Sequence, residues 1–349
     1  MRKYKDYYVI IFFLILSVLS IIAAKVGLNF ILGELYSRFI RNTIFLLALI
    51  FPIMAGMGIN FSITIGAIVA QIAMLIVIDI GIIPQWGFIV AIFLCIVLST
   101  VLGNIIGNLL NKAKGKEMIV SMVVGFLGTS LHQLIFMVGY GTVIKPFNKD
   151  ILLTRGIGVK SMLDIGAYKN LFKNLLPIRI GDRVVSLVPI IIVILLAILV
   201  DLITKSKLGY HMNAVGENMH LSEKVGIDVD KTRKMAIVLS TILASLAQIM
   251  FIQNLGILNV YIGHLNLDIF AAAALLAGGA TFKKANIKNV FIGVLLFHTL
   301  FIVSPLAGQN IFKNPALGEY FRSFVAYGTI VFALMANLKK EETEGTIIE

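Results

Sequence analysis

The 349-residue sequence has few of the groups that soluble enzymes and metal sites use. Only 14% of its residues are charged, and residues 43–110 carry a single charged side chain, that of Asp79. The one cysteine, Cys95, lies within an apolar run, which excludes an internal disulfide and a thiolate metal cluster. The five histidines show no metal-ligand spacing. We therefore expect no metal and no cofactor.

Sequence motifs of common catalysts are also missing. No G-x-x-x-x-G-K-[ST] phosphate-binding loop occurs, because the only Gly-Lys pair, Gly115-Lys116, is followed by Glu117 and lacks the upstream glycine. There is no H-E-x-x-H zinc motif and no G-x-S-x-G nucleophile motif. These absences disfavour an ATPase and a membrane-embedded enzyme, so we expect a non-catalytic chain.

Hydrophobic side chains are what the sequence has in abundance. They make up 59% of the residues, against about 45–50% in an ordinary soluble protein, and the mean hydropathy is +0.96. The net charge of +12 does not indicate nucleic-acid binding, because Lys and Arg lie mainly at the ends of apolar runs. This pattern predicts an integral membrane protein.

The apolar runs predict about ten transmembrane helices, since a bilayer core of about 30 Å requires about 20 apolar residues per helix. The first run could instead be a signal peptide, but it is long for one and lacks a small-x-small cleavage pattern. We therefore interpret it as a retained helix. The expected spans are 7–24, 43–59, 62–80, 84–110, 118–140, 184–204, 235–253, 267–282, 289–306 and 320–338.

The predicted fold is an all-α integral membrane protein with one transmembrane domain over residues 1–349. Its halves, about 1–140 and 184–338, are joined by an outer loop at 141–183. Lys and Arg are more frequent on the side of the membrane that carries both termini and the polar loop 205–234. By the positive-inside rule, we expect both termini and this polar loop to be cytoplasmic.

The outer loop contains one amphipathic stretch. The sequence YKNLFKNLLP places Leu171, Phe172, Leu175 and Leu176 on one helical face, with the lysines elsewhere. That pattern favours a short helix lying on the outer membrane surface, and docking of an external partner is the alternative.

One internal repeat predicts two inverted halves of five spans each. INFSITIGAIVA and LNLDIFAAAALL align without gaps and pair Asn60 with Asn266 and Ser62 with Asp268. The first stretch heads the third expected span, and the second heads the eighth, which runs in the opposite direction. Inverted-repeat transporters bind substrate near the interface of their halves, so these four residues are candidates for the substrate path. Asp268 could alternatively cap its helix.

The polar loop at 205–234 differs sharply from its surroundings. Eleven charged residues occur between Asp201 and Lys234, so this part of the chain must face water or another protein. Within it, ENMHLSEKVGI starts after Gly216 and stops near Gly226, which predicts a helix of about two to three turns. A short helix bounded by glycines is suited to the groove of a partner protein.

At this loop the sequence resembles a known family. SKLGYHMNAVGENMHLSEKVGIDVDKTRKMAIVLSTILASLAQIM resembles the cytoplasmic coupling segment of ABC-importer permeases that handle simple sugars, nucleosides and branched-chain amino acids. The likeness is carried by LGY at 208–210, AVGEN at 214–218 and GIDV at 226–229. GINFSITIGAIVA and LNLDIFAAAALLAGGATF are similar to two further segments of these permeases.

The resemblance implies a permease subunit of an ATP-driven importer in the bacterial cytoplasmic membrane, in contact with lipid and not with nucleic acid. Its implied partners are two ATP-binding ABC subunits, a second permease copy or a paralogue, and an extracytoplasmic solute-binding protein. We expect a small polar solute, with a simple sugar first and a nucleoside or a branched-chain amino acid as alternatives. The rival class is a secondary transporter or channel, which the scarcity of intramembrane acids disfavours. The residues expected to couple the chain to the ATPase are Gly209, Gly216, Glu217, Asn218, Glu223, Gly226 and Asp228.

Overall fold

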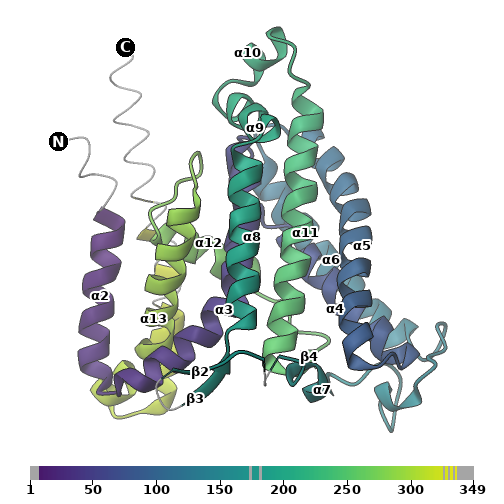
Figure 1. Ribbon diagram of the computed structural model, residues 1–349, viewed down its shortest axis with the longest axis vertical. Coiled ribbons are helices and arrows are strands. Elements are labelled where there is room, and N and C mark those ends of the chain that lie inside the picture. Colours follow the sequence, from purple (N-terminus) through teal and green to yellow (C-terminus); the bar gives the residue numbers. More distant parts are fainter. Residues whose placement is uncertain are drawn as a thin grey trace.

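The computed structural model describes residues 8–172, 175–180, 183–324, 327–328, 331–332 and 335, and it is predominantly helical (Figure 1). The longer helices are α2 (Tyr8–Ala24), α3 (Leu28–Met54), α4 (Ile63–Ile80), α5 (Pro84–Lys112), α6 (Glu117–Leu134), α8 (Val188–Thr204), α9 (Lys207–Glu217), α11 (Val229–Leu255), α12 (Leu267–Ala277) and α13 (Ile287–Phe312). The short elements are η1 (Ile135–Gly139), η2 (Lys149–Ile151), α7 (Gly166–Lys169), α10 (Met219–Lys224), β1 (Met162–Asp164), β2 (Pro177–Ile180), β3 (Arg183–Ser186) and β4 (Ile257–Asn259).

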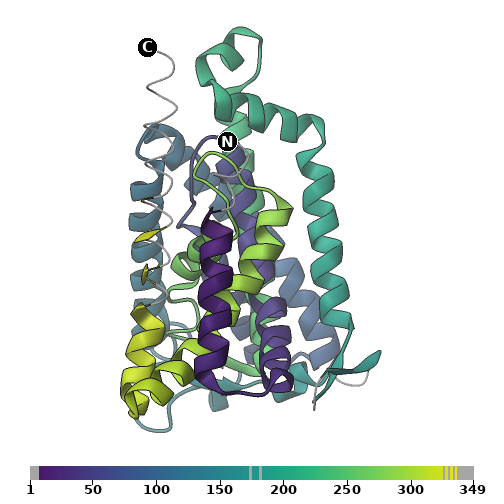
Figure 2. The ribbon, with the colours of Figure 1, turned by 90° about the vertical axis from the view of Figure 1, so that its left-hand side faces the viewer.

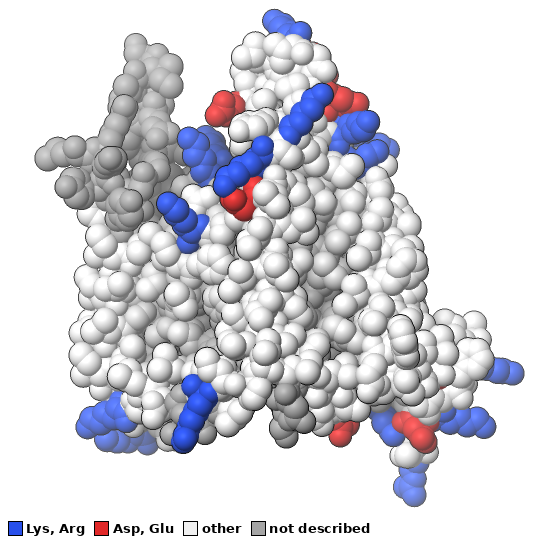
Figure 3. All heavy atoms as spheres, viewed as in Figure 1, with Lys and Arg blue, Asp and Glu red and all other residues white. Residues whose placement is uncertain are grey.

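The helices have the length and composition of membrane spans. Among the described residues, six helices are long and apolar enough to cross a bilayer, and a seventh crossing results if α8 and α9, bent by 67°, form one broken span. On the face seen in Figure 3, charged side chains gather at the two ends of the molecule, with an uncharged band between them. The expectation of an all-α membrane protein is confirmed. α2 and α12 are apolar but shorter, and the tenth expected span, 320–338, lies partly outside the described residues.

The second span begins much earlier than hydropathy predicts. We expected it at residue 43, whereas α3 already begins at Leu28. Its first half contains Arg38 and Arg41, whose guanidinium carbons lie 4.9 Å from the ring centre of Phe301 and 5.7 Å from that of Phe251. Aromatic faces attract such cations, so the helix accommodates charges that a hydropathy count assigns to a loop.

Two helix ends also differ from the expected limits. α3 ends at Met54 rather than at residue 59, and the break before α4 contains Gly56 and Gly58 in the left-handed region, with φ of 72° and 69°. α12 ends at Ala277 rather than at residue 282, because Gly279 has a φ of 84°. Glycines therefore end both helices before their apolar runs end.

α11 lies at the centre of the bundle and packs against α3, α4 and α5. On α5, Gly103 and Gly107 face it. A Cβ at Gly103 would lie 2.9 Å from the Cα of Val238, and a Cβ at Gly107 would lie 2.8 Å from the Cγ of Lys234. Small residues spaced by four permit this close approach of two membrane helices, so α5 and α11 form a tight pair.

The outer loop is held to the bundle by strands and by a buried carboxylate. β1 pairs antiparallel with β4, and β2 with β3, at the end of the molecule opposite α10 (Figure 1). Near the end of α4, Asp79 accepts hydrogen bonds from the Tyr140 hydroxyl at 2.6 Å and from the Asn148 backbone N–H at 2.9 Å. Asp79 thus ties α4 to the start of the loop.

The prediction of an amphipathic helix in this loop is wrong. α7 ends at Lys169, Leu171 and Phe172 lie in a turn, and β2 begins at Pro177. Leu176 has a φ of 47°, outside the helical region. A residue before proline is disfavoured in the helical conformation, which accounts for the break. Lys173 and Asn174 lie outside the described residues.

Candidate functional site

The polar loop forms a segment that projects from the bundle. α9 and α10, here called the projecting segment, lie at one end of the bundle, and α10 extends furthest beyond it in both views (Figures 1 and 2). α9 leaves α8 at a bend of 67°. Gly209 lies in the first turn of α9, where a Cβ would collide with the Thr204 carbonyl. A glycine at this position therefore allows the sharp turn out of the span.

Capping residues define the end of the projecting segment. Asn218 ends α9, and its side-chain oxygen accepts a hydrogen bond from the Leu221 N–H at 2.9 Å, which caps α10. Asp228 caps α11 through the Lys231 N–H at 2.9 Å, and Gly226 has a φ of 85° between the two helices. The expected single helix is instead two, with Gly216 and Glu217 in the last turn of α9 and only six residues in α10.

Gly216 joins the projecting segment to the end of α3. A Cβ at Gly216 would collide with the Met54 carbonyl and lie 3.0 Å from the Gly56 nitrogen. Only glycine allows this backbone contact, because any larger residue would separate α9 from the α3–α4 break. A displacement of α9 therefore acts directly on the break that precedes α4.

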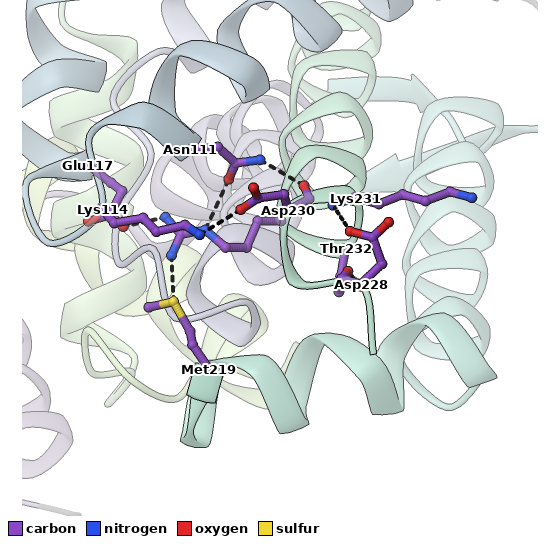
Figure 4. Close-up of polar contacts among 9 residues, drawn as sticks. Asn111, Lys114, Glu117, Met219, Asp228, Asp230, Lys231 and Thr232 are labelled. Carbon is purple, nitrogen blue, oxygen red and sulfur yellow. Dashed lines mark hydrogen bonds and ion pairs between the residues drawn. The ribbon is translucent and has the colours of Figure 1, made fainter. Parts of the chain in front are cut away.

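A second link is formed by Arg233 in the second turn of α11, and Figure 4 shows its surroundings. Arg233 is completely buried. Its Nη2 pairs with Glu117 at the start of α6, its Nε donates to Asn111 Oδ1 at 3.1 Å, and its Nη1 lies 3.0 Å from the Met219 sulfur on α10. We call Arg233, Glu117, Asn111 and Met219 the Arg233 cluster. It connects α5, α6 and α11 to the projecting segment.

A surface layer covers the Arg233 cluster. Lys114 Nζ lies 2.7 Å from Asp230 Oδ1, and the Asn111 side-chain N–H donates to the Asp230 carbonyl at 2.7 Å. Both contacts join the end of α5 and the following turn to the first turn of α11 (Figure 4). The ion pair between Lys114 and Asp230 is exposed and stabilises little, whereas the buried pair beneath it strongly constrains the positions of α6 and α11.

The tip of the projecting segment carries exposed side chains, some of which are apolar. Leu221 is 58% exposed and Val225 is 69% exposed, and Glu217 and Glu223 lie exposed beside them. Exposed aliphatic side chains rimmed by charges are typical of a protein contact. The sequence analysis did not predict that these apolar side chains point outward.

The first pair of candidate path residues lies together at the α3–α4 break. Asn60 Oδ1 accepts hydrogen bonds from the Ser62 N–H at 3.1 Å and from the Ser62 hydroxyl at 2.5 Å. The Asn60 amide donates to the Ser240 hydroxyl on α11 at 3.2 Å. All three side chains are buried. The break therefore places a polar contact between α4 and α11 inside the bundle.

The second pair of candidates is split by the structure. Asp268 is buried in the first turn of α12, where its carboxylate interacts with the Thr64 hydroxyl on α4 and with the Ile269 N–H at 2.9 Å. Asn266, just before α12, is exposed and has a φ of 61°. Asp268 thus meets the same part of α4 as Asn60 and Ser62, while the Asn266 side chain does not.

Further buried polar groups continue from this point along α4 and α11. Gln71 hydrogen-bonds His264 Nδ1 at 2.9 Å, and Gln248 donates to the Gly263 carbonyl at 3.0 Å. We define the polar seam as the buried residues Asn60, Ser62, Thr64, Gln71, Ser240, Gln248, His264 and Asp268. Sequence reasoning missed Gln71 and Gln248, although a glutamine within an otherwise apolar run is a visible signal.

The seam also fixes the chain between α11 and α12. Within residues 256–266, the Val260 carbonyl lies 2.8 Å from His132 Nε2, and the Tyr261 hydroxyl donates to the Val159 carbonyl at 2.7 Å. The rings of His132 and His264 meet edge to face at 5.2 Å. These contacts give His132 a structural role, because its ring holds the backbone carbonyl of Val260.

Comparison with known proteins finds one matching family and relatives that are similar over part of the chain. The family model described as "Branched-chain amino acid transport system / permease component" matches residues 31–334. The chain is 30% identical over 135 residues to the "Xylose transport system permease protein XylH" of Haemophilus influenzae, covering 38% of this chain and 34% of that protein. It is 28% identical over 125 residues to the "Tyrosine transport system permease protein" of Clostridioides difficile, covering 36% and 40% respectively. The matches therefore span less than half the length of these relatives, and no solved structure matches significantly.

Proposed function

The chain belongs to the family of branched-chain amino acid transport system permease components, and from this we propose that it is the membrane subunit of an ATP-driven ABC importer. Membership places it in the bacterial inner membrane as a multi-pass protein, in agreement with its apolar helices. In this proposal the chain hydrolyses no ATP itself. Two ATP-binding subunits supply the energy, a second permease copy or a paralogue completes the membrane part, and an extracytoplasmic binding protein delivers the solute.

The observation that carries this proposal is the projecting segment. It presents exposed Leu221 and Val225 to a partner, while Gly216 and Arg233 connect it to α3 and to the starts of α6 and α11. Closure of an ATPase against this tip would therefore move helix ends on both sides of the α3–α4 break. Gly209, Asn218, Gly226 and Asp228 shape the segment, and Glu217 and Glu223 are the charged contacts that we assign to the ATPase.

We place the solute path along the polar seam. Asn and Ser side chains donate and accept hydrogen bonds, and the Asp268 carboxylate accepts them, which suits a hydroxyl-rich solute. Asn60, Ser62 and Asp268 form the central part of this path, and exposed Asn266 lies at its edge. In the present conformation the seam is closed, so transport requires that α4 and α12 separate from α11.

The order of elements supports two inverted halves, about 1–140 and 184–338. α3 and α11 are each 27 residues long, and each is followed by a break and then by a helix that starts at one of the two matching motifs. α2 begins at the same end of the bundle as the projecting segment (Figures 1 and 2). We propose that this end is cytoplasmic, that both termini lie there, and that ten spans complete the domain.

We propose a simple sugar as the solute. The partial likeness to the xylose permease supports this choice, and the partial likeness to the tyrosine permease supports an amino acid as the second candidate. A nucleoside is the third. The test is to purify the chain from its native membrane with the ATPase and binding protein that accompany it, and to measure ATP-dependent uptake of xylose, a nucleoside, leucine and tyrosine in proteoliposomes. Uptake without any co-purifying ATP-binding subunit would contradict the importer assignment and favour a secondary transporter.

A further inference from the structure

A groove of about 990 Å³ lies between α5 and α11, at the end of the bundle that carries the projecting segment. From α5 it is lined by Thr100, Asn104, Asn108 and Asn111, which recur every three to four residues and so share one helical face. Amide groups on an outward face of a membrane helix are unusual, because lipid chains offer them no hydrogen bonds. The groove is therefore polar on one wall.

Three lysines surround the open end of the groove. Lys112 is the last residue of α5, and Lys231 and Lys234 lie in the first turns of α11. Within the described part of the chain, none of the three is in an ion pair. In Figure 4 the Lys231 side chain extends away from the ion-paired side chains of Lys114 and Asp230.

The acidic residues of the groove do not neutralise these lysines. Asp230 lies 2.7 Å from Lys114, which stands outside the groove lining. Asp228 accepts the Lys231 backbone N–H at 2.9 Å and so caps α11, where a helix N-terminus favours negative charge. The ammonium groups of Lys112, Lys231 and Lys234 therefore give the open end of the groove an excess of positive charge.

The α11 wall of the groove becomes apolar with depth. Val238, Leu239 and Ile242 line it from α11, one to three turns beyond the lysines. Lys231 and Ile242 are separated by about 16 Å along the helix axis, at 1.5 Å per residue. Gly103 of α5 lies against Val238 and Gly107 lies against Lys234, so Thr100 and Asn104 face the aliphatic side chains across the groove. Cations at the open end can receive a phospholipid headgroup, and the aliphatic wall of α11 below them can receive an acyl chain.

We propose that this groove binds one anionic phospholipid from the leaflet on the side of the projecting segment. Basic recesses between membrane helices suit anionic headgroups. The exposed Asn108 amide can donate to a phosphate or ester oxygen, whereas the Asn104 and Asn111 amides already donate to the Thr100 and Asp230 carbonyls. A second copy of the chain is a poorer occupant, because a symmetric contact would place the same lysines opposite one another. The identity of the leaflet rests on the proposed function, whereas the preference for an anionic lipid rests on the charges of the groove.

The experiment is native mass spectrometry of the purified full-length chain with added phosphatidylglycerol or phosphatidylcholine of matched acyl chains. We expect the wild-type chain to retain phosphatidylglycerol in preference. Removing the charges in Lys112→Gln/Lys231→Gln/Lys234→Gln should weaken phosphatidylglycerol binding about fivefold per lysine, or about 100-fold in total, and leave phosphatidylcholine binding unchanged. Because these side chains lie at the rim of the groove, the fold should tolerate the change.

The matched control replaces three exposed lysines at the same end of the bundle but outside the groove, in Lys116→Gln/Lys205→Gln/Lys207→Gln. It should bind phosphatidylglycerol like the wild type. Equal losses in both triple variants, or equal retention of the two lipids by the wild type, would overturn the proposal.

A second measurement tests the rival occupant. In a Cys95→Ala background, Asn108→Cys should be modified by a maleimide reagent in lipid-free detergent and protected by phosphatidylglycerol. Efficient cross-linking of two chains through this cysteine would place a second copy in the groove and overturn the lipid proposal. Co-purification of ATP-binding subunits is scored on the same samples, and its absence, with lipid selectivity intact, would contradict the importer assignment alone.

Discussion

Replacing either Arg233 or Glu117 alone should strongly lower the free energy of unfolding, whereas replacing both should change it little. Arg233 is 0% exposed and Glu117 is 7% exposed, so removing either partner leaves a charge with little access to water. Loss of one partner of such a pair costs about 3–5 kcal/mol, whereas apolar replacement of both is often neutral or stabilising. We therefore expect Arg233→Met and Glu117→Met each to lower the free energy of unfolding by about 3–5 kcal/mol. The double variant should recover most of this loss.

The assay is the thermal unfolding midpoint of the purified chain in one detergent, measured for the wild type, both single variants and the double variant as a mutant cycle. The control is Lys205→Met, which removes an exposed pair with Asp201 at 2.5 Å and should change stability by no more than about 0.5 kcal/mol. Single variants that unfold like the control, or costs that simply add in the double variant, would refute the reasoning.

The same cycle separates stability from coupling. The double variant lacks the guanidinium that contacts Asn111 and the Met219 sulfur, so the link between α5, α11 and α10 is lost even where the fold is regained. We expect this variant to insert, unfold at a near-normal temperature and bind the ATPase, yet to transport poorly. Normal transport by the double variant would show that the Arg233 cluster serves folding alone.

Two further predictions concern the path and the outer loop. Asn60→Leu removes the acceptor of both Ser62 hydrogen bonds, so transport should fall while ATPase binding persists. The control is Asn42→Leu, because the Asn42 amide donates only to the Arg38 carbonyl of its own helix. Equal transport by the two variants would remove Asn60 from the path. Asp79→Ala leaves the Tyr140 hydroxyl and the Asn148 N–H without their acceptor, so it should cost about 1–3 kcal/mol and speed proteolysis of the outer loop. The exposed Asp150→Ala should do neither, and equal proteolysis of both variants would contradict this role of Asp79.

Charge contrast made the projecting segment predictable from the sequence. Eleven charged residues between two apolar runs cannot lie in lipid, and Asn218 and Asp228 are ordinary helix-capping residues. The sequence does not predict the split into α9 and α10, because glycines at 216 and 226 indicate the limits of a single helix. Gly216 instead lies within α9 and makes a close backbone contact with Met54, which depends on tertiary packing.

The parts that sequence reasoning missed depend on partners far apart in the chain. Arg233 is 116 residues from Glu117, and no local pattern pairs them. The charged first half of α3 was assigned to a gap between spans, because a hydropathy count cannot anticipate that Phe301 and Phe251 receive Arg38 and Arg41. The outer amphipathic helix failed for a local reason, since Pro177 begins a strand directly after Leu176.

The central claim, that the projecting segment is where an ATP-binding subunit docks, is tested most directly by cross-linking at its tip. Leu221→Cys in a Cys95→Ala background presents one thiol on α10, and Trp86→Cys presents an equally exposed thiol at the opposite end of the bundle. Membranes holding the assembled complex are treated with a short bifunctional maleimide, and the products are identified by mass. We predict a cross-link from residue 221 to an ATP-binding subunit and none from residue 86. No such product from residue 221 in a complex that still transports would contradict the claim.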